Sequence, residues 1–168
     1  MTNNNQKQSF LYRNRKFIGI LLCAMLLALF LFRFFLYLGI VTSTSMEPTL
    51  LPGSVLIGVR HKEPSRGDVG IFYDNGFYLV KRVIGQPGDT VEFTESSVIV
   101  NGEILNEPYV KNPAVNTPLM VQIPENKYLV LGDNRANSYD FRETRTFIER
   151  NQFVATLKLI IQPGGWKK

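Results

Sequence analysis

Two side chains in this sequence could act together as a nucleophile and a base. Ser45 lies in the hydroxyl-rich segment 43–49, and Lys81 interrupts the apolar run of residues 77–84. A serine hydroxyl needs an adjacent base to become nucleophilic. Burial of a lysine disfavours its charged form, so the neutral amine can accept a proton. The pair would therefore allow hydrolysis through a covalent serine mechanism.

Each of these residues also has an explanation that requires no chemistry. Ser45 closely follows a long apolar segment, and Ser/Thr clusters with a proline are common where helices end. A lysine in an edge strand discourages aggregation. Both faces of the 77–84 run are mostly apolar, so periodicity does not decide whether Lys81 or Arg82 is buried. A third polar segment, residues 132–142, could be a surface turn.

Histidine and cysteine offer little for catalysis or metal binding. His61 lies in the charged stretch 60–63, which we expect on a surface loop, so a Ser-His-Asp triad is a poor explanation. The single cysteine, Cys23, excludes an intrachain disulfide and argues against a cysteine-based metal cluster. We therefore expect no metal and no cofactor.

An N-terminal apolar segment precedes Ser45. Residues 17–41 contain one charge, Arg33, and are long enough to cross a hydrocarbon core of about 30 Å as a helix. A cleaved signal sequence is the alternative, but its apolar region usually has only about 7–15 residues. Four basic residues precede the span and none occurs in the six residues after it. The positive-inside rule then makes 1–16 a cytoplasmic tail and 42–168 an extracytoplasmic catalytic domain.

The charge distribution gives no support to nucleic-acid binding. The net charge of +5 comes from the four basic residues of the tail and from Arg33, because residues 42–168 hold fourteen basic and fourteen acidic side chains. Proteins that bind nucleic acids need a basic surface. The folded part is neutral, so we do not expect a nucleic-acid partner.

After residue 42 the pattern is typical of a mainly β domain, with short apolar runs between turn signals. Asn75-Gly76 and Asn101-Gly102 favour type I′ hairpins, and residues 86–89 favour another tight turn. Four prolines in 106–126 favour an irregular loop. The expected strands are residues 55–59, 69–73, 77–84, 90–93, 97–100, 127–131 and 153–161.

Four motifs in series resemble those of the type I signal peptidase family. The motif S-M-x-P-T occurs at residues 45–49 and K-R-V-x-G-x-P-G-D at residues 81–89. G-D-N-R-x-x-S-x-D occurs at residues 132–140, and P-x-x-G-D-V at residues 64–69. Any one of these motifs alone would be a weak signal. All four occur in the expected order behind an N-terminal anchor, which makes the resemblance strong.

The resemblance implies a membrane-bound serine endopeptidase with a signal-peptidase-like all-β catalytic domain and one N-terminal transmembrane helix. Such an enzyme cleaves N-terminal signal peptides from exported preproteins after small residues of the Ala-x-Ala type. Its partners would be preprotein signal peptides, the lipid bilayer and the protein-export machinery, at the outer face of a bacterial cell membrane. The endoplasmic-reticulum branch has histidine where this chain has Lys81, and the short outward domain favours a Gram-positive-like form.

The resemblance also implies roles for individual residues. Ser45 would be the nucleophile and Lys81 the general base. The oxyanion hole would be formed by the Ser43 hydroxyl and the Ser45 backbone amide. Three further residues would support the site: Ser138, which orients the lysine amine, and Asp140 with Arg142, which form a structural ion pair.

The sequence departs from the family pattern after Ser138. Phe141 replaces the second serine of S-x-D-S-R, and residues 143–148 replace a glycine-led stretch and a proline. These departures leave open a maturation protease dedicated to one pilin or other surface protein. The alternative from another class is a catalytically silent, membrane-anchored β module that binds peptides. Retention of both Ser45 and Lys81 argues against that alternative. The cytoplasmic self-cleaving repressors use the same chemistry but do not fit an anchored, outward-facing domain.

Overall fold

The structure, a computed structural model, describes residues 14–111 and 116–164. It divides into two units, Met1–Leu36 and Tyr37–Lys168, which we describe separately. Most of the expected basic tail, residues 1–16, lies outside the described residues. The cytoplasmic placement of that tail stays a prediction.

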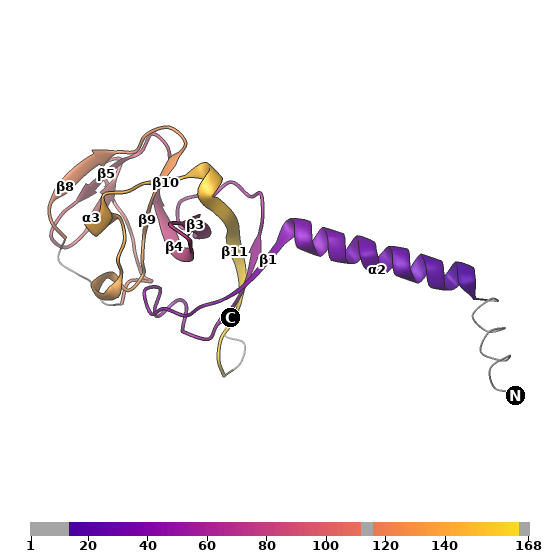
Figure 1. The fold of residues 1–168 in the computed structure, drawn as a ribbon. Coiled ribbons are helices and arrows are strands. Elements are labelled where there is room, and N and C mark those ends of the chain that lie inside the picture. Colours follow the sequence, from indigo (N-terminus) through magenta and orange to yellow (C-terminus); the bar gives the residue numbers. More distant parts are fainter. Residues whose placement is uncertain (1–13, 112–115, 165–168) are drawn as a thin grey trace, which may run out of the picture. The chain divides into compact units, whose positions relative to one another are not determined.

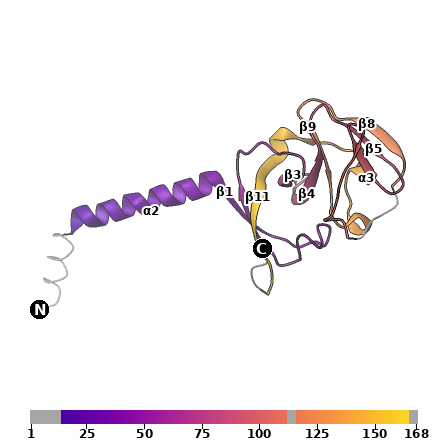
Figure 2. The same ribbon diagram turned by 180° about the vertical axis from the view of Figure 1, so that it is seen from behind.

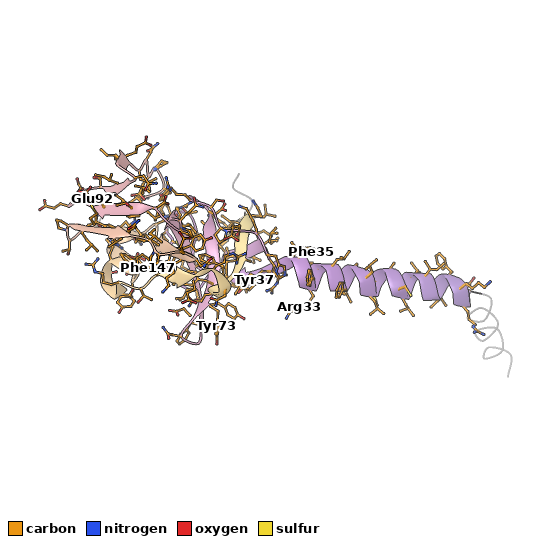
Figure 3. The ribbon with its side chains drawn as sticks, turned by 90° about the horizontal axis from the view of Figure 1, so that it is seen from above. Arg33, Phe35, Tyr37, Tyr73, Glu92 and Phe147 are labelled. Atoms are coloured by element: carbon orange, nitrogen blue, oxygen red, sulfur yellow. The ribbon has the colours of Figure 1, made fainter. Side chains whose placement is uncertain are left out.

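The first unit contains the helix α2, Arg15–Phe35, which is a candidate membrane span by its length and composition. None of its residues is buried within the protein, and Arg33 and Phe35 mark its C-terminal turn in Figure 3. The helix ends six residues before the expected end of the span. Leu36 has extended backbone angles, φ −111° and ψ 151°, and residues Leu36–Ile40 form strand β1 instead.

The second unit contains two β-sheets, one of seven strands in the order β1-β2-β11-β3-β4-β9-β10 and one of four strands in the order β7-β6-β5-β8 (Figures 1 and 2). The strand pairs from β2 to β10 in the larger sheet are antiparallel. The remaining strands are β2 Val55–Val59, β3 Val69–Asp74, β4 Phe77–Gly85, β5 Thr90–Phe93, β6 Val98–Val100, β7 Glu103–Ile104, β8 Leu119–Gln122, β9 Lys127–Leu131, β10 Ile148–Glu149 and β11 Phe153–Ile161.

The mainly β prediction is confirmed, and all seven expected strands are present within one residue at each end. Four strands were not expected: β1, β7, β8 and β10. Of these, β8 lies inside the stretch 106–126, for which we expected an irregular loop. Short helices connect some of the strands: η1 Arg135–Asn137, α3 Phe141–Thr144 and η2 Arg150–Gln152.

The expected tight turns have the backbone that their sequences require. Asn75 and Gly76 have φ values of 48° and 89°, and Asn101 and Gly102 have φ values of 54° and 84°. Two successive positive φ angles are the mark of a type I′ hairpin. Gly88 also has a positive φ, 83°, in the turn at residues 86–89. The first hairpin joins β3 to β4, the strand that carries Lys81.

Two hydrophobic clusters hold in place the segment around Ser45 and the segment around Asp140. One cluster joins the two sheets and includes Phe93 of β5, Leu131 of β9 and Phe141 of α3. The other packs the segment after β1 onto the larger sheet through Val41, Met46 and Leu50; the last two are almost fully buried. Each cluster therefore anchors one of the chain segments that form the site.

Candidate functional site

Ser45 lies in a turn between β1 and β2. The turn is closed by a hydrogen bond from the Glu47 amide to the Thr44 carbonyl at 3.1 Å. The Ser43 and Ser45 hydroxyl oxygens are 3.3 Å apart. The interpretation of Ser45 as part of a helix exit is wrong, because α2 ends at Phe35 and strand β1 follows it. The polar turn is instead held by the burial of its apolar neighbours.

Lys81 lies in the interior of the larger sheet, where β4 is flanked by β3 and β9. It pairs across the β3–β4 ladder with Gly70, and the residue is only 6% exposed. The interpretation as an edge-strand lysine is therefore wrong. Burial lowers the pKa of its amine below the usual 10.5, and the negative charge of Asp140 partly opposes this shift.

A short chain of hydrogen bonds orients the Lys81 amine. Lys81 Nζ donates to Ser138 Oγ at 2.8 Å, and Ser138 Oγ donates to Asp140 Oδ2 at 2.6 Å. A serine hydroxyl has one proton, which here goes to the carboxylate. Ser138 can therefore only accept from the amine. One N–H of a neutral Lys81 is thereby fixed, and its lone pair must point elsewhere.

Asp140 is held in its ionised form by several donors. The Gly132 amide donates to its Oδ2 at 2.9 Å, and the Arg142 guanidinium donates to both carboxylate oxygens at 2.9 and 3.0 Å. Burial alone would raise the pKa of Asp140, but the bonds from Arg142, Gly132 and Ser138 keep it below its usual value. Ser138 and Asp140 are both buried, so the surface-turn interpretation of residues 132–142 is wrong.

The segment with Asp140 is bonded directly to the segment with Ser45. The Asn134 amide donates to the Ser45 carbonyl at 3.0 Å, and its side chain donates to the Thr44 carbonyl at 3.1 Å. Asn137 Nδ2 donates to the Thr44 hydroxyl at 2.6 Å. Three hydrogen bonds, two of them to backbone carbonyls, therefore fix residues 44 and 45 to the loop that orients Lys81.

Gly132 marks the point at which these segments meet. A Cβ atom at this position would lie 2.1 Å from Ser138 Oγ and 2.5 Å from the Ser45 carbonyl oxygen. Real Cβ contacts of this kind essentially never fall below 3.0 Å. Only glycine allows the Ser45 backbone and the Lys81–Ser138 pair to approach each other this closely.

A second buried ion pair lies behind the site and was not singled out from the sequence. The Arg82 guanidinium donates to both oxygens of Asp133, at 2.8 and 2.6 Å, and the Thr49 hydroxyl donates to the same carboxylate. All three residues lie inside the motifs quoted above, which was the available signal: Arg82 follows Lys81, Asp133 follows Gly132, and Thr49 ends the motif that begins at Ser45. The Asp133 carboxylate therefore connects the segments that contain Ser45, Lys81 and Gly132.

Two further residues brace this ion pair from a distant part of the chain. The ring of Tyr109 lies under the Arg82 guanidinium at 3.9 Å, and the Tyr109 hydroxyl donates to Glu107 at 2.9 Å. Glu107 in turn accepts from Arg135 Nη1 at 2.9 Å. Burial and the charge of Glu107 raise the pKa of Tyr109 well above its usual value. No local pattern in the proline-rich stretch points to these contacts.

The structure also explains the two departures from the family pattern. Phe141 is buried and stacks on Phe93 with ring centroids 6.2 Å apart, so position 141 is a core position. Arg145 follows α3 in the left-handed region with φ 57°. That is the conformation for which glycine is normally used. Residue 145 therefore has a left-handed backbone although it is not a glycine.

Other expected features of the site can be located as well. His61 is exposed on the loop between β2 and β3, as expected from its charged surroundings. Within residues 14–111 and 116–164, no group of three or more histidine, cysteine, aspartate or glutamate side chains could hold a metal ion. The site therefore offers a buried, oriented amine on β4, and the segment that carries the Ser45 hydroxyl is hydrogen-bonded to the loop that orients this amine.

The chain is similar to signal peptidases over most of its length. The family model described as "Signal peptidase, peptidase S26" matches residues 14–162. Signal peptidase I of Bacillus licheniformis is 34% identical over 95% of this chain and 92% of its own length. Signal peptidase I S of Bacillus subtilis is 34% identical over 83% of this chain and 84% of its own.

A cyanobacterial relative and a solved structure agree with these matches. The probable signal peptidase I-2 of Synechocystis is 40% identical over 60% of this chain, and the match spans about half of that protein's length. The crystal structure of a signal peptidase I from Enterococcus faecalis matches with a TM-score of 0.52 and 32% identity, covering 58% of this chain and 98% of the other. The chain therefore belongs to the S26 family of signal peptidases.

Proposed function

We propose that this chain removes signal peptides from exported preproteins with Ser45 as the nucleophile and Lys81 as the general base. The observation that carries the proposal is the buried Lys81 amine, oriented by Ser138 in a loop that is hydrogen-bonded to the Ser45 backbone. Membership in the signal peptidase family supports the reaction type. The assignment of roles to individual side chains is our own.

In the first half of the reaction, the neutral amine of Lys81 accepts the Ser45 hydroxyl proton while the oxygen attacks the scissile carbonyl. The Ser43 hydroxyl, 3.3 Å from Ser45 Oγ, and the Ser45 amide would donate to the resulting oxyanion. The protonated lysine then gives its proton to the leaving amine, which departs and leaves an acyl-enzyme. In the second half, Lys81 takes a proton from water as the water attacks the ester; the bond from Ser45 Oγ to the acyl carbon breaks, Lys81 returns the proton to Ser45, and the signal peptide leaves with a free carboxyl group.

The lowered pKa of Lys81 favours this cycle, because it increases the fraction of the amine that is neutral. A fully exposed lysine would be almost entirely protonated near neutral pH and could not accept a proton. Burial in β4 favours the neutral form, and the bond to Ser138 leaves the lone pair free for the serine proton. Arg142 neutralises the Asp140 carboxylate, which would otherwise favour a protonated amine more strongly.

The substrate would bind along the exposed first half of β4. Tyr78 is exposed on the face of β4 opposite to Leu79 and Lys81, and Tyr37 of β1 packs against it with ring centroids 5.9 Å apart. An extended peptide between these strands would make main-chain hydrogen bonds and present alternate side chains to one face. The first and third residues before the scissile bond would point the same way and be small, as in Ala-x-Ala.

The enzyme is membrane-anchored, with α2 as the candidate span. We further propose that the N-terminus lies in the cytoplasm and the β domain at the outer face of a bacterial membrane. This orientation rests on the basic residues before the span. Preproteins would then reach the site while their apolar segments are still in lipid, close to the protein-export machinery.

The test is cleavage of a preprotein by the full chain in detergent micelles. Ser45→Ala and Lys81→Ala should each abolish cleavage, because the covalent mechanism cannot replace either group. Lys81→Arg should fail too, because a guanidinium stays protonated. The matched controls are Ser96→Ala and Lys158→Ala, which change the same residue types at exposed positions.

Near wild-type turnover by any of the three site variants, in protein that is folded by circular dichroism, would contradict the dyad. Binding of a preprotein by the wild type without any cleavage would instead favour the peptide-binding module. A substrate range restricted to one surface protein would favour the dedicated maturation protease.

A further inference from the structure

A cavity of about 540 Å³ opens beside Lys81. It is formed by β3, β4, β9 and the segment 139–148, which includes α3; Figure 1 shows α3 and β9 in the same part of the domain. Its apolar wall includes Phe72, Leu79 and Ile148. A volume of this size can hold a full-sized side chain, much larger than the alanine of an Ala-x-Ala site.

The wall of the cavity also carries negative charge. Asp74 accepts a hydrogen bond from Gln152 Nε2 at 3.0 Å, and Glu143 accepts one from the Asp140 amide at 3.1 Å. Both donors are neutral groups, so neither hydrogen bond brings a positive charge to these two carboxylates. The third carboxylate of the wall, Asp140, is neutralised by Arg142. When Lys81 is in its neutral, active form, the cavity therefore has a negative field.

The reaction sequence decides which part of a substrate meets this cavity. Under the proposed function, on which this step rests, Lys81 returns its proton to the leaving amine. That amine belongs to the first residue after the scissile bond and must come within hydrogen-bond reach of Lys81. Each further substrate residue adds at most about 3.6 Å of reach. Because Lys81 lines the cavity, the first substrate residues after the scissile bond begin at its mouth.

We propose that this cavity is a subsite for the mature part of the preprotein. It receives the side chain of one of the first three residues after the scissile bond. Its apolar wall takes an aliphatic side chain such as leucine, and its carboxylates favour a lysine side chain, whose long apolar stem fits the same wall. An acidic side chain at the same position is disfavoured, because it would meet Asp74 and Glu143.

The test uses soluble peptides with a constant Ala-x-Ala segment. Leucine, lysine or glutamate is placed singly at the first, second or third position after the scissile bond, and kcat/KM is measured for each peptide. At one or more positions, leucine and lysine should exceed glutamate by roughly two- to fivefold, the range of a partly exposed charge interaction.

The variant Asp74→Asn removes one charge and keeps an oxygen that can accept from Gln152. It should lower the ratio of the lysine to the glutamate rate. The matched control is Glu92→Gln, the same loss of charge on β5 in the other sheet, labelled in Figure 3. It should leave the ratio as it is in the wild type.

The outcomes separate the subsite from the function on which it rests. Equal cleavage of all peptides, or an unchanged lysine-to-glutamate ratio in Asp74→Asn, would overturn the subsite and leave the signal peptidase mechanism intact. Failure of the wild type to cleave any of the peptides after Ala-x-Ala would overturn both.

Discussion

Replacement of Gly132 by alanine tests whether the approach of the two catalytic segments is essential. The added Cβ would lie 2.5 Å from the Ser45 carbonyl oxygen, which belongs to the backbone and cannot rotate away. It would also lie 2.1 Å from Ser138 Oγ and 2.5 Å from Ser138 Cβ. A change of the Ser138 rotamer would remove the contact with Oγ but not the contact with Cβ, because Cβ is fixed by the backbone.

The size of the effect follows from the required displacement. Ordinary van der Waals contact begins at 3.4 Å, so the Ser45 backbone and the Gly132 strand end must separate by roughly 1 Å. A misplacement of this size in an active site can lower the rate about 100-fold. Overpacking of a tight site costs about 1–3 kcal/mol of stability. We expect Gly132→Ala to fold but to lose about two orders of magnitude in kcat.

The assay is kcat on a soluble Ala-x-Ala peptide, with thermal unfolding followed by circular dichroism. The control is Gly19→Ala, because a Cβ at Gly19 would meet nothing within 4 Å. This control should keep wild-type kcat. A Gly132→Ala protein with wild-type kcat would show that the reaction tolerates separation of Ser45 from the Lys81–Ser138 pair, and the geometric argument would be refuted.

Three further predictions concern charge and backbone strain. Arg82→Met should lower the free energy of unfolding by about 3–5 kcal/mol in urea denaturation, because the fully buried Asp133 carboxylate loses its cation; adding Asp133→Asn should recover part of the loss. Lys81→Met should abolish cleavage yet raise stability at pH 7, because it removes a buried amine whose charged form is disfavoured in the folded protein. The pKa of Lys81 is lower in the folded protein than in the unfolded chain, so the unfolded chain binds more protons between these two pKa values. The free energy of unfolding of the wild type should therefore rise with pH up to about 10.5. A pH titration that shows the same rise in Lys81→Met would contradict this. Arg145→Gly should raise the free energy of unfolding by up to about 1 kcal/mol, because Arg145 has φ 57°; an unchanged or lower melting temperature would count against strain at this position.

Much of the β domain could be predicted because its strands are bounded by strong turn signals. The asparagine-glycine pairs at 75–76 and 101–102 mark hairpins by conformational preference alone. Strand β1 could not be predicted in this way. Leu36–Ile40 continues the apolar run of the helix, so no change in hydropathy marks the boundary. The helix ends there because the next residues pair with β2, which is a tertiary effect.

Part of the site could also be predicted from the sequence. The family motifs contain Lys81, Ser138 and Asp140, and the structure brings these three residues together in one hydrogen-bonded chain. The burial of Lys81 was not predictable from periodicity, because both faces of its strand are apolar; it follows from the interior position of β4 in the sheet. Glu107 and Tyr109 were missed because their partners lie 27 or 28 residues away and leave no local pattern.

The stacking of Phe141 on Phe93 limits how far this protein can be reduced in size. Asp140, which anchors the lysine network, is the residue immediately before Phe141, and Phe93 belongs to the four-stranded sheet. Although that sheet contributes no side chain to the Lys81–Ser138–Asp140 chain, a minimal enzyme that omitted it would expose Phe141 and loosen the turn that holds Asp140. Its outer strand β7, by contrast, has two exposed residues and is the natural place to attach a tag or an added segment.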